Sequence, residues 1–293
     1  MGNLKEIRIR IASVESTQKI TGAMKLVSAA KLRKAQTAIQ NLRPYSNKLN
    51  EILQDLSEAA GSMEELPLFQ ERAPENIVLV VLSSNRGLCG SFNSNVVKEV
   101  HRLVNGKYAE QAKRGHVKLM CFGKKAKEGL GKEFELLKYS EELIETPNFT
   151  DAAEIAQSLM DDFINKKIDK VEIVYNQFLN AATQALTVEN YLPISKLGTD
   201  TQAASSSRDY IFEPSKKEIL EELIPKIMKL QLFKTLIDSS ASEHGARMTA
   251  MHKATDSATE ILKDLRLKYN NARQSAITNE LIEIVSGAEA LNG

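Results

Sequence analysis

Apolar residues recur every three or four positions over a long stretch at the start of the chain. Within residues 3–56 they occupy the heptad positions Leu4, Ile7, Ile11, Val14, Leu32, Ala35, Ile39, Leu42, Leu49, Leu53 and Leu56. A repeat of this period predicts a helix that packs along one side against a second helix. With about 54 residues, the helix would measure roughly 80 Å. Pro44 is the expected position of a kink.

A second stretch with the same period closes the chain. Ser215 and Glu218 have the spacing of a capping box, which predicts a helix start. The seam positions that follow are Leu223, Ile227, Leu230, Lys234, Ile237, Ala241, His244, Met248, Met251, Thr255, Ala258, Leu262, Leu265, Tyr269, Ala272 and Ala276. We expect up to about 77 helical residues, with a kink at Pro225. Two such helices, joined by a small domain, predict a left-handed antiparallel coiled coil whose longer second helix projects beyond the first.

The first helix has a polar interruption in its seam. The heptad positions in its middle hold Gln18, Thr21, Lys25 and Ser28. The apolar side chains of this segment lie one step around the helix, at Ile20, Ala23, Met24, Val27 and Ala30. An isolated pair of helices gains nothing from this shift, whereas a helix enclosed by other chains can bury the displaced side chains. The segment therefore predicts a surface for partner subunits.

The residues between the two helices have a different period. Apolar and β-branched runs predict strands at 76–84, 116–123, 170–178 and 183–194, whereas 134–143 is ambiguous. Helices are expected from Asn93 or Ser94 to about residue 104, and over 150–167, where Asp151 and Glu154 have capping-box spacing. This alternation predicts a small, partly parallel, Rossmann-like α/β domain beside the coiled coil. The expected division is a helix over 1–56, a connection and α/β domain over 57–208 with a loop at 198–208, and a helix over 209–293.

Composition and charge narrow the class of protein. Only 14 Gly and 7 Pro occur among 293 residues, and this scarcity of helix breakers favours long helices. The longest strongly apolar run, 77–82, is far too short for a membrane span. Two cysteines make no disulfide framework, so a reducing compartment is expected. Residues 1–56 carry ten Lys/Arg against four Asp/Glu, which suits nucleic acid, acidic lipid, an acidic protein surface or a solvated face.

The motifs that could carry chemistry are weak. The loop 83–93 follows a strand and precedes a helix, where an α/β domain would hold a phosphate, but it contains neither G-x-G-x-x-G nor G-x-x-x-x-G-K-[ST]. A structural turn is therefore the preferred interpretation. Cys89 in this loop has no protease or redox spacing around it, and we expect a packed, unreactive thiol. The four His are scattered and no C-x-x-C occurs, so catalytic, cofactor-binding and metal-binding residues are not predicted.

Four separated motifs resemble the gamma subunit of F-type ATP synthases. They are "IRIRIASVESTQKITGAMKLVSAAKLRKAQ" near the start, "RGLCGSFN" in the loop, "ARMTAMHKATDSATEIL" at 246–262, and a final segment with Ile277-Thr278-x-Glu280, Glu283 and Gly287-Ala288-x-Ala290. The resemblance covers essentially the whole chain. It implies the rotor shaft, or central stalk, of a proton- or sodium-driven ATP synthase, which couples rotation of the membrane c-ring to conformational cycling of the catalytic beta subunits. ATP chemistry would then occur on other subunits, so the resemblance implies a non-catalytic chain without a cofactor.

The resemblance also implies contact residues. Arg273 and Gln274 match the family's contact with the catch loop of beta, where a guanidinium and an amide can hydrogen-bond acidic and hydroxyl groups. Met24 matches the position that faces the acidic lever segment of beta. The basic residues expected to pair with that segment are Lys25, Lys31, Arg33 and Lys34. The residues expected in the apolar bearing of the head are Ile277, Leu281, Ile284 and Val285, with Thr278 and Glu280 in the same signature and Tyr210 near the c-ring.

The implied partners are the alpha and beta subunits, the epsilon subunit and the c-ring, with no nucleic acid, and with the membrane reached only through the complex. The chain begins with Met directly at the first helix, without a transit peptide, which predicts the cytoplasmic face of a bacterial inner membrane. Two interpretations compete with this one. A static coiled-coil adaptor would have a regular seam and no exposed apolar tip. A nucleotide-dependent enzyme with helical arms would need a phosphate-binding loop.

Overall fold

The computed structural model describes residues 2–60, 66–194 and 216–292. Its two longest elements are helix α1 (Gly2–Ala60) and helix α7 (Lys216–Asn292). Both of the predicted long helices are therefore confirmed.

The chain divides into two compact units, and each long helix contributes to both. Residues 1–28 together with 248–293 form the terminal unit, and residues 29–247 form the central unit. Pro44 and Pro225 both lie inside the long helices of the central unit, and neither of them ends its helix. The boundaries expected at 56 and 208 stay a prediction.

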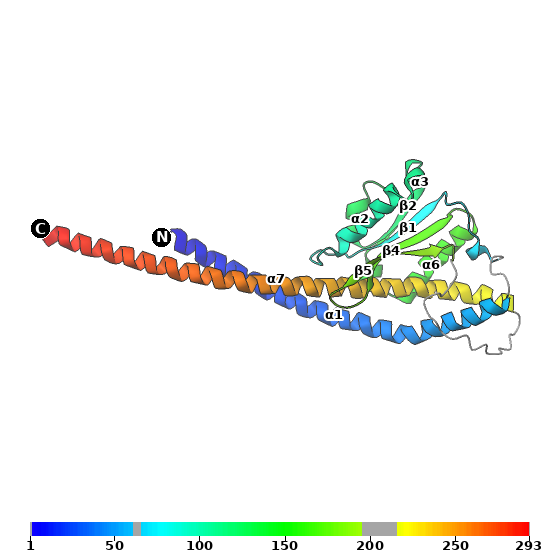
Figure 1. Ribbon diagram of the computed structural model, residues 1–293, viewed down its shortest axis with the longest axis horizontal. Helices are drawn as coiled ribbons and strands as arrows, with labels where there is room; N and C mark the ends of the chain where they lie inside the picture. Colours follow the sequence, from blue (N-terminus) through cyan, green and yellow to red (C-terminus); the bar gives the residue numbers. More distant parts are fainter. Residues whose placement is uncertain (1, 61–65, 195–215, 293) are drawn as a thin grey trace. The chain divides into compact units, whose positions relative to one another are not determined.

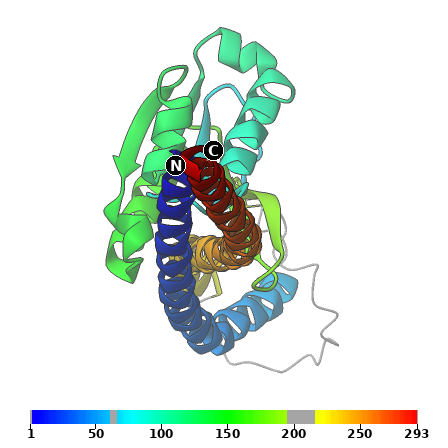
Figure 2. The same ribbon diagram turned by 90° about the vertical axis from the view of Figure 1, so that its left-hand side faces the viewer.

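The two helices of the terminal unit run antiparallel, with the N- and C-termini at the same end (Figures 1 and 2). The hydroxyl oxygens of Thr21 and Thr255 lie 2.9 Å apart. Arg266, further along α7, pairs at 2.7 Å with Glu15, which comes earlier in α1. The side chains of α7 that are buried in this unit are Met251, Ala258, Leu262 and Leu265. All four are heptad positions, so the predicted antiparallel coiled coil is confirmed.

The central unit contains a five-stranded sheet of order β3-β2-β1-β4-β5. Its strands are β1 (Ile77–Leu82), β2 (Val117–Phe122), β3 (Glu135–Ser140), β4 (Lys170–Phe178) and β5 (Gln184–Leu192). The first four strands are mutually parallel, and β5 runs antiparallel to β4. The partly parallel α/β domain is thus confirmed, and the ambiguous segment contains β3.

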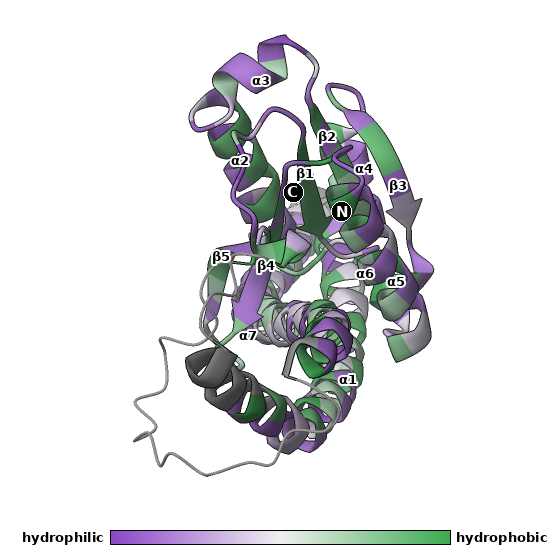
Figure 3. Cartoon of the chain, turned by 90° about the vertical axis from the view of Figure 1, so that its right-hand side faces the viewer, coloured by the Kyte–Doolittle hydropathy of each residue, from purple (hydrophilic) through white to green (hydrophobic). Residues whose placement is uncertain are grey.

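Helices cover both faces of this sheet. They are α2 (Phe92–Asn105), α3 (Ala109–Lys113), α4 (Lys124–Leu130), α5 (Glu142–Glu145) and α6 (Phe149–Ile164), with a short 3₁₀ helix, η2, at Pro67–Phe69. Alternate residues of β1 join two apolar clusters, one shared with α2 and α4 and the other with α6 and α7. A strand buried on both faces must be apolar throughout. Strand β1 is accordingly green along its length in Figure 3.

The predicted helices α2 and α6 are both confirmed, but their predicted capping residues are wrong. Helix α6 is capped by Asn148, whose side-chain oxygen accepts a hydrogen bond from the Asp151 backbone N–H at 2.8 Å. The extended backbone of Asn148 suits an N-cap, so the helix starts before Asp151. Helix α2 begins at Phe92, and the side chain of Asn93 accepts a hydrogen bond from the backbone N–H of Ser84 at 2.9 Å instead of capping a helix. Ser215 and the loop 198–208 lie outside the described residues.

Candidate partner-binding surface

The polar interruption of α1 lies in the seam of the terminal unit. Thr21 is 9% exposed and Ser28 is 3% exposed. Gln18 Nε2 donates a hydrogen bond to Thr259 Oγ1 across the seam at 2.7 Å. The Thr21 hydroxyl also donates to the Gln18 carbonyl oxygen at 3.1 Å. Hydrogen bonds therefore satisfy this layer, which avoids the cost of about 1–3 kcal/mol for a buried polar group without a partner.

The displaced apolar residues face outward. We call Ile9, Ile20, Ala23 and Val27 the α1 belt, because their spacings of eleven, three and four residues place them on one face of the helix. Ile9, Ile20 and Val27 are 61%, 56% and 58% exposed. Exposed apolar residues that share one face of a helix, when the helix already has a partner on its other side, indicate a second interaction surface.

Met24 and Lys25 lie beside this belt. Met24 is half-buried, and its carbonyl oxygen accepts a hydrogen bond from Ser28 Oγ at 2.8 Å. Lys25 Nζ lies 3.4 Å from His252 Nδ1. This His252 nitrogen is also 3.3 Å from a carboxylate oxygen of Asp256. The Lys25 ammonium therefore lies against α7, and an ion pair with another subunit would have to replace this contact.

The other predicted basic residues belong to the central unit. Lys31, Arg33 and Lys34 are all exposed on α1. None of the three side chains has an ion-pair partner within the ranges that the structure describes. They are thus available to an acidic surface, whereas Lys25 in the terminal unit already has a neighbour. Tyr210 lies outside the described residues and stays a prediction.

Helix α7 continues past its last contact in the seam. Ala276 is half-buried, and every residue from 277 to 288 is exposed. In Figure 1 the red end of α7 extends beyond the blue start of α1, so the projecting tip is confirmed. The large apolar side chains exposed there are Ile277, Leu281, Ile282, Ile284 and Val285, which we call the α7 tip. Ile277, Leu281 and Ile284 lie within about 60° on the helical wheel and form a stripe.

Arg273 and Gln274 lie one turn before this stripe, and both are exposed. Arg273 shares a face with Ile277, four residues later. The Thr278 hydroxyl donates to the Gln274 carbonyl oxygen at 2.9 Å, so this hydroxyl is occupied within the helix. Glu280 is exposed at the edge of the stripe. The structure therefore groups Arg273, Gln274 and the apolar tip on one free helix end.

The central unit has a contact that the sequence analysis missed. Arg247 is buried, and its guanidinium pairs with Glu243 Oε1 at 2.6 Å. It also donates to the carbonyl oxygens of Arg86 at 3.0 Å and Gly87 at 3.4 Å, which ties the loop 83–93 to α7. Burial raises the pKa of Glu243, and the Arg247 charge opposes this shift. The available sequence signal was a pair of opposite charges four residues apart within an otherwise apolar and small segment.

The loop 83–93 follows β1. The strand order of the sheet reverses between β1 and β4. Ligands of α/β sheets usually bind at such a point, beside the loops that follow the strands. Here the protein's own side chains bind the loop. Cys89 is buried, and its Sγ lies 3.2 Å from Asn93 Nδ2. Burial raises the pKa of the Cys89 thiol, which disfavours the reactive thiolate. The packed thiol is confirmed, and the contacts are those of a structural turn.

Across residues 2–60, 66–194 and 216–292, no helix combines the length and the apolar character needed to cross a lipid bilayer. The same ranges contain no group of three or more His, Cys, Asp or Glu side chains arranged to hold a metal ion.

Comparison with known proteins identifies the family. The family model described as ATP synthase matches residues 3–291. The chain is 51% identical to the ATP synthase gamma chain of Christiangramia forsetii and 50% identical to that of Flavobacterium johnsoniae, in each case over 100% of both chains. The central stalk in a Tetrahymena thermophila mitochondrial ATP synthase structure is 26% identical, with a TM-score of 0.57 over 80% of this chain and 99% of that one. A rotor chain of the Euglena gracilis mitochondrial enzyme, 17% identical, shares the fold with a TM-score of 0.63 over 94% of this chain and 99% of that one. The chain belongs to the family of ATP synthase gamma chains.

Proposed function

We propose that this chain is the rotor shaft of a proton- or sodium-driven ATP synthase and transmits rotation of the c-ring to the catalytic beta subunits. The observation that carries the proposal is the terminal unit, a coiled coil with an exposed apolar belt along α1 and an exposed apolar tip on α7. A surface of this kind becomes favourable when a surrounding sleeve of protein excludes water from it, at about 25 cal/mol per Å² of apolar area.

The mechanical role follows from the same geometry. Two helices with a shared seam resist bending and twisting better than one, so torque applied at one end can reach the other. The α7 tip, free of its partner helix, suits a shallow apolar bearing in which it turns. Apolar contacts are non-directional, and therefore they hold the tip without fixing its rotational angle.

Polar residues near the belt and the tip would transmit force. Arg273 and Gln274 are proposed to hydrogen-bond the catch loop of beta, and Met24 to face its acidic lever segment. Lys31, Arg33 and Lys34, exposed and without an ion pair among the described residues, would meet the same acidic segment. Lys25 would exchange its contact with His252 for this segment in some rotary positions.

The chain itself is proposed to be non-catalytic. Its partners would be the alpha and beta subunits, the epsilon subunit and the c-ring, on the cytoplasmic face of a bacterial inner membrane. The alternative of a static adaptor predicts a regular seam and no exposed apolar tip. The hydrogen-bonded seam layer at Thr21 and the exposed residues 277–288 favour the rotor instead.

The test is reconstitution of the full chain with its alpha and beta subunits. We expect a stable complex whose ATP hydrolysis rises when the chain is present, and whose chain rotates in single-molecule recordings. If the complex forms but the alpha and beta subunits hydrolyse ATP at the same rate with and without the chain, the rotor function would be overturned. Failure to form any complex would overturn the partners as well.

A variant separates transmission from assembly. Arg273→Ala with Gln274→Ala should lower coupled ATP synthesis by about tenfold, the equivalent of 1.4 kcal/mol, while the thermal midpoint of the isolated chain stays unchanged because both side chains are exposed. Lys263→Ala, another exposed position of α7 in the same unit, is the matched control. Equal loss in the control, or loss of folding in the double variant, would contradict the assigned role.

A further inference from the structure

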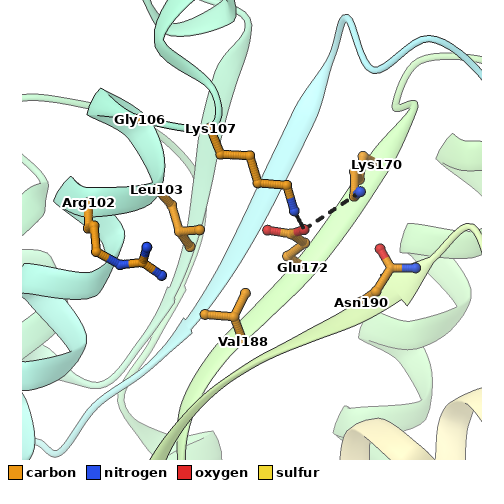
Figure 4. A pocket seen from close by; sticks show the side chains of 8 residues that line it. All are labelled: Arg102, Leu103, Gly106, Lys107, Lys170, Glu172, Val188 and Asn190. Carbon is orange, nitrogen blue, oxygen red and sulfur yellow. Dashed lines mark hydrogen bonds and ion pairs between the residues drawn. The ribbon is translucent and has the colours of Figure 1, made fainter.

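Strand β5, the second strand of the β4–β5 hairpin, has one face directed to helix α7 within the central unit. Successive side chains of a strand point to opposite faces of the sheet. Val188 and Asn190 line a pocket beside the end of α2 (Figure 4). Glu189 and Tyr191 lie on the other face, and both bind α7.

Two side-chain hydrogen bonds join β5 to α7. Gln231 Nε2 donates to Glu189 Oε1 at 2.6 Å, and the Tyr191 hydroxyl donates to the Met228 carbonyl oxygen at 2.9 Å. The Tyr175 hydroxyl of β4 donates to Glu189 Oε2 at 3.0 Å. Both carboxylate oxygens of Glu189 are therefore engaged, one toward each neighbouring element.

The tip of the same hairpin contacts α7 again at Gly245, which lies about 25 Å along the helix from Met228. Gly245 is buried. A Cβ added there would lie 3.2 Å from the carbonyl oxygen of Ala181 and 3.4 Å from its Cα. These distances are shorter than the optimum for non-bonded atoms, and both Ala181 atoms belong to the backbone. We call this direct contact of two backbones the hairpin seat.

Glycine is an unfavourable residue for this position unless the seat requires it. Gly245 lies in the interior of α7, where glycine destabilises a helix relative to alanine. Its backbone is helical, so no left-handed conformation demands glycine. The close approach of Ala181 is the reason that remains.

The hairpin tip is a turn held from within. Asn180 Oδ1 accepts hydrogen bonds from the backbone N–H groups of Ala182 at 2.9 Å and Thr183 at 2.8 Å. Asn180 and Thr183 also exchange backbone hydrogen bonds at 3.1 and 3.3 Å. These bonds fix the residues on both sides of Ala181, so the tip can press on Gly245 without changing shape.

We propose that the β4–β5 hairpin passes force between the α/β domain and α7, with Gly245 as the positioning residue of the seat. The inference rests on the proposed rotor function. If the head encloses the terminal unit, force from the c-ring enters the central unit, and the part that enters at the α/β domain must cross to α7.

The geometry suits this role. Contacts at two levels about 25 Å apart resist tilting of the hairpin against the helix. A contact between backbones contains no side chain that can change its rotamer, and close-packed interiors transmit strain. Arg247, in the same turn of α7 as Gly245, binds the loop 83–93, so two segments of the α/β domain are fixed at this level.

The test compares two activities of the reconstituted enzyme that contains the full chain. Gly245→Val places its side chain against Ala181 and should displace the hairpin tip. We expect ion-driven ATP synthesis to fall by about tenfold or more, while chain-dependent ATP hydrolysis by the alpha and beta subunits changes by less than about twofold. Hydrolysis needs only the terminal unit inside the head, whereas synthesis needs the force that crosses the hairpin. Ala182→Val, at an exposed position of the same tip, is the matched control and should change neither activity.

The outcomes separate this inference from the rotor function. Unchanged synthesis in Gly245→Val would overturn the inference, as would an equal loss of synthesis and hydrolysis or an equal loss in Ala182→Val. A wild-type chain that does not raise hydrolysis would overturn the proposed rotor function instead.

A milder variant tests the seat even if Gly245→Val fails to fold. Gly22→Ala is the reference, because nothing lies within 4 Å of a Cβ added at Gly22 in helix α1. Alanine favours the helix, so Gly22→Ala should slow hydrogen exchange of the neighbouring backbone amides by about fourfold. Gly245→Ala should not slow exchange around residue 245, because the contact with Ala181 offsets the gain. Equal slowing in both variants would mean that the hairpin gives way freely, and would overturn the seat.

Discussion

The two halves of helix α7 have different surroundings. Between residues 220 and 247, in the central unit, apolar side chains are buried around most of the helix, and so are the polar side chains Thr235, Asp238, Ser239, Ser240, Ser242, Glu243 and Arg247. From residue 248 onward, the buried residues among those described are Met251, Ala258, Leu262 and Leu265, and the last turns have none. The first half is thus enclosed by its own chain and the second is covered along one stripe.

This difference shows where the chain depends on other molecules. A helix enclosed by its own chain must satisfy its buried polar groups internally, as Arg247 does with Glu243 and two backbone carbonyl groups. A helix covered on one side keeps apolar residues such as Ile284 in water. The chain alone gains nothing from that exposure, and therefore the second half is adapted to a partner.

The largest expected effect is at the buried ion pair. Arg247→Ala should lower the free energy of unfolding by about 3–5 kcal/mol, because it leaves the buried Glu243 carboxylate without its ion-pair partner. It also removes the donors to the carbonyl oxygens of Arg86 and Gly87. Chemical denaturation of the full chain measures the change.

A double variant is the control for this pair. Glu243→Leu with Arg247→Leu removes both charges and should recover most of the loss, because apolar side chains of similar size can replace a buried ion pair. If the double variant is as unstable as Arg247→Ala, the loop contacts rather than the charge determine stability.

The second effect compares the two apolar surfaces directly. Leu236 is fully buried in the central unit, and Leu236→Ala should cost about 2–5 kcal/mol. Ile284 is exposed at the α7 tip, and Ile284→Ala should change stability by no more than about 0.5 kcal/mol. In the reconstituted complex, Ile284→Ala should weaken the affinity for the partner subunits more than Leu236→Ala does. A large loss of stability from Ile284→Ala would mean that the tip is packed in the free chain.

A smaller, pH-dependent effect is expected at Asp238. Burial raises the pKa of this carboxyl to about 6, although Lys234 and Arg43 oppose the shift. The folded pKa is above the unfolded value, so the stability contributed by protonated Asp238 is present at low pH and is lost as the pH rises through about 6. Asp238→Asn removes this loss. It should stabilise the chain by about 1–3 kcal/mol at pH 8 and have almost no effect at pH 4. Equal stabilisation at both values would contradict the assigned cause.

Periodicity in the sequence was enough to predict the two long helices, because a seam repeated every seven residues leaves few alternatives. Their antiparallel pairing followed from the small domain that joins them, and short apolar, β-branched runs predicted four of the five strands, with the segment of β3 left ambiguous. Helix starts were less predictable. Asn148, rather than Asp151, caps α6 because its backbone is extended there, and backbone conformation is not a property of the sequence pattern. The exposed belt and tip could be inferred from apolar residues outside the seam. The Arg247 contact could not, because it joins segments that lie far apart in the chain.

The smallest effect concerns the polar layer of the seam. Thr21→Val with Thr255→Val replaces both hydroxyls by methyl groups of similar shape, and removal of both hydrogen-bond partners is nearly neutral or stabilising. Hydrogen exchange of backbone amides over residues 15–28 should therefore change by less than about tenfold, or 1.4 kcal/mol. Leu262→Ala, in the buried part of the same seam, is the control and should speed exchange by more than this. If the Thr pair proves as costly as Leu262, the layer is needed to hold the helices together. If it is neutral, the chain's own stability does not account for threonine at these positions, and the same double variant in the reconstituted complex should then lower coupled ATP synthesis.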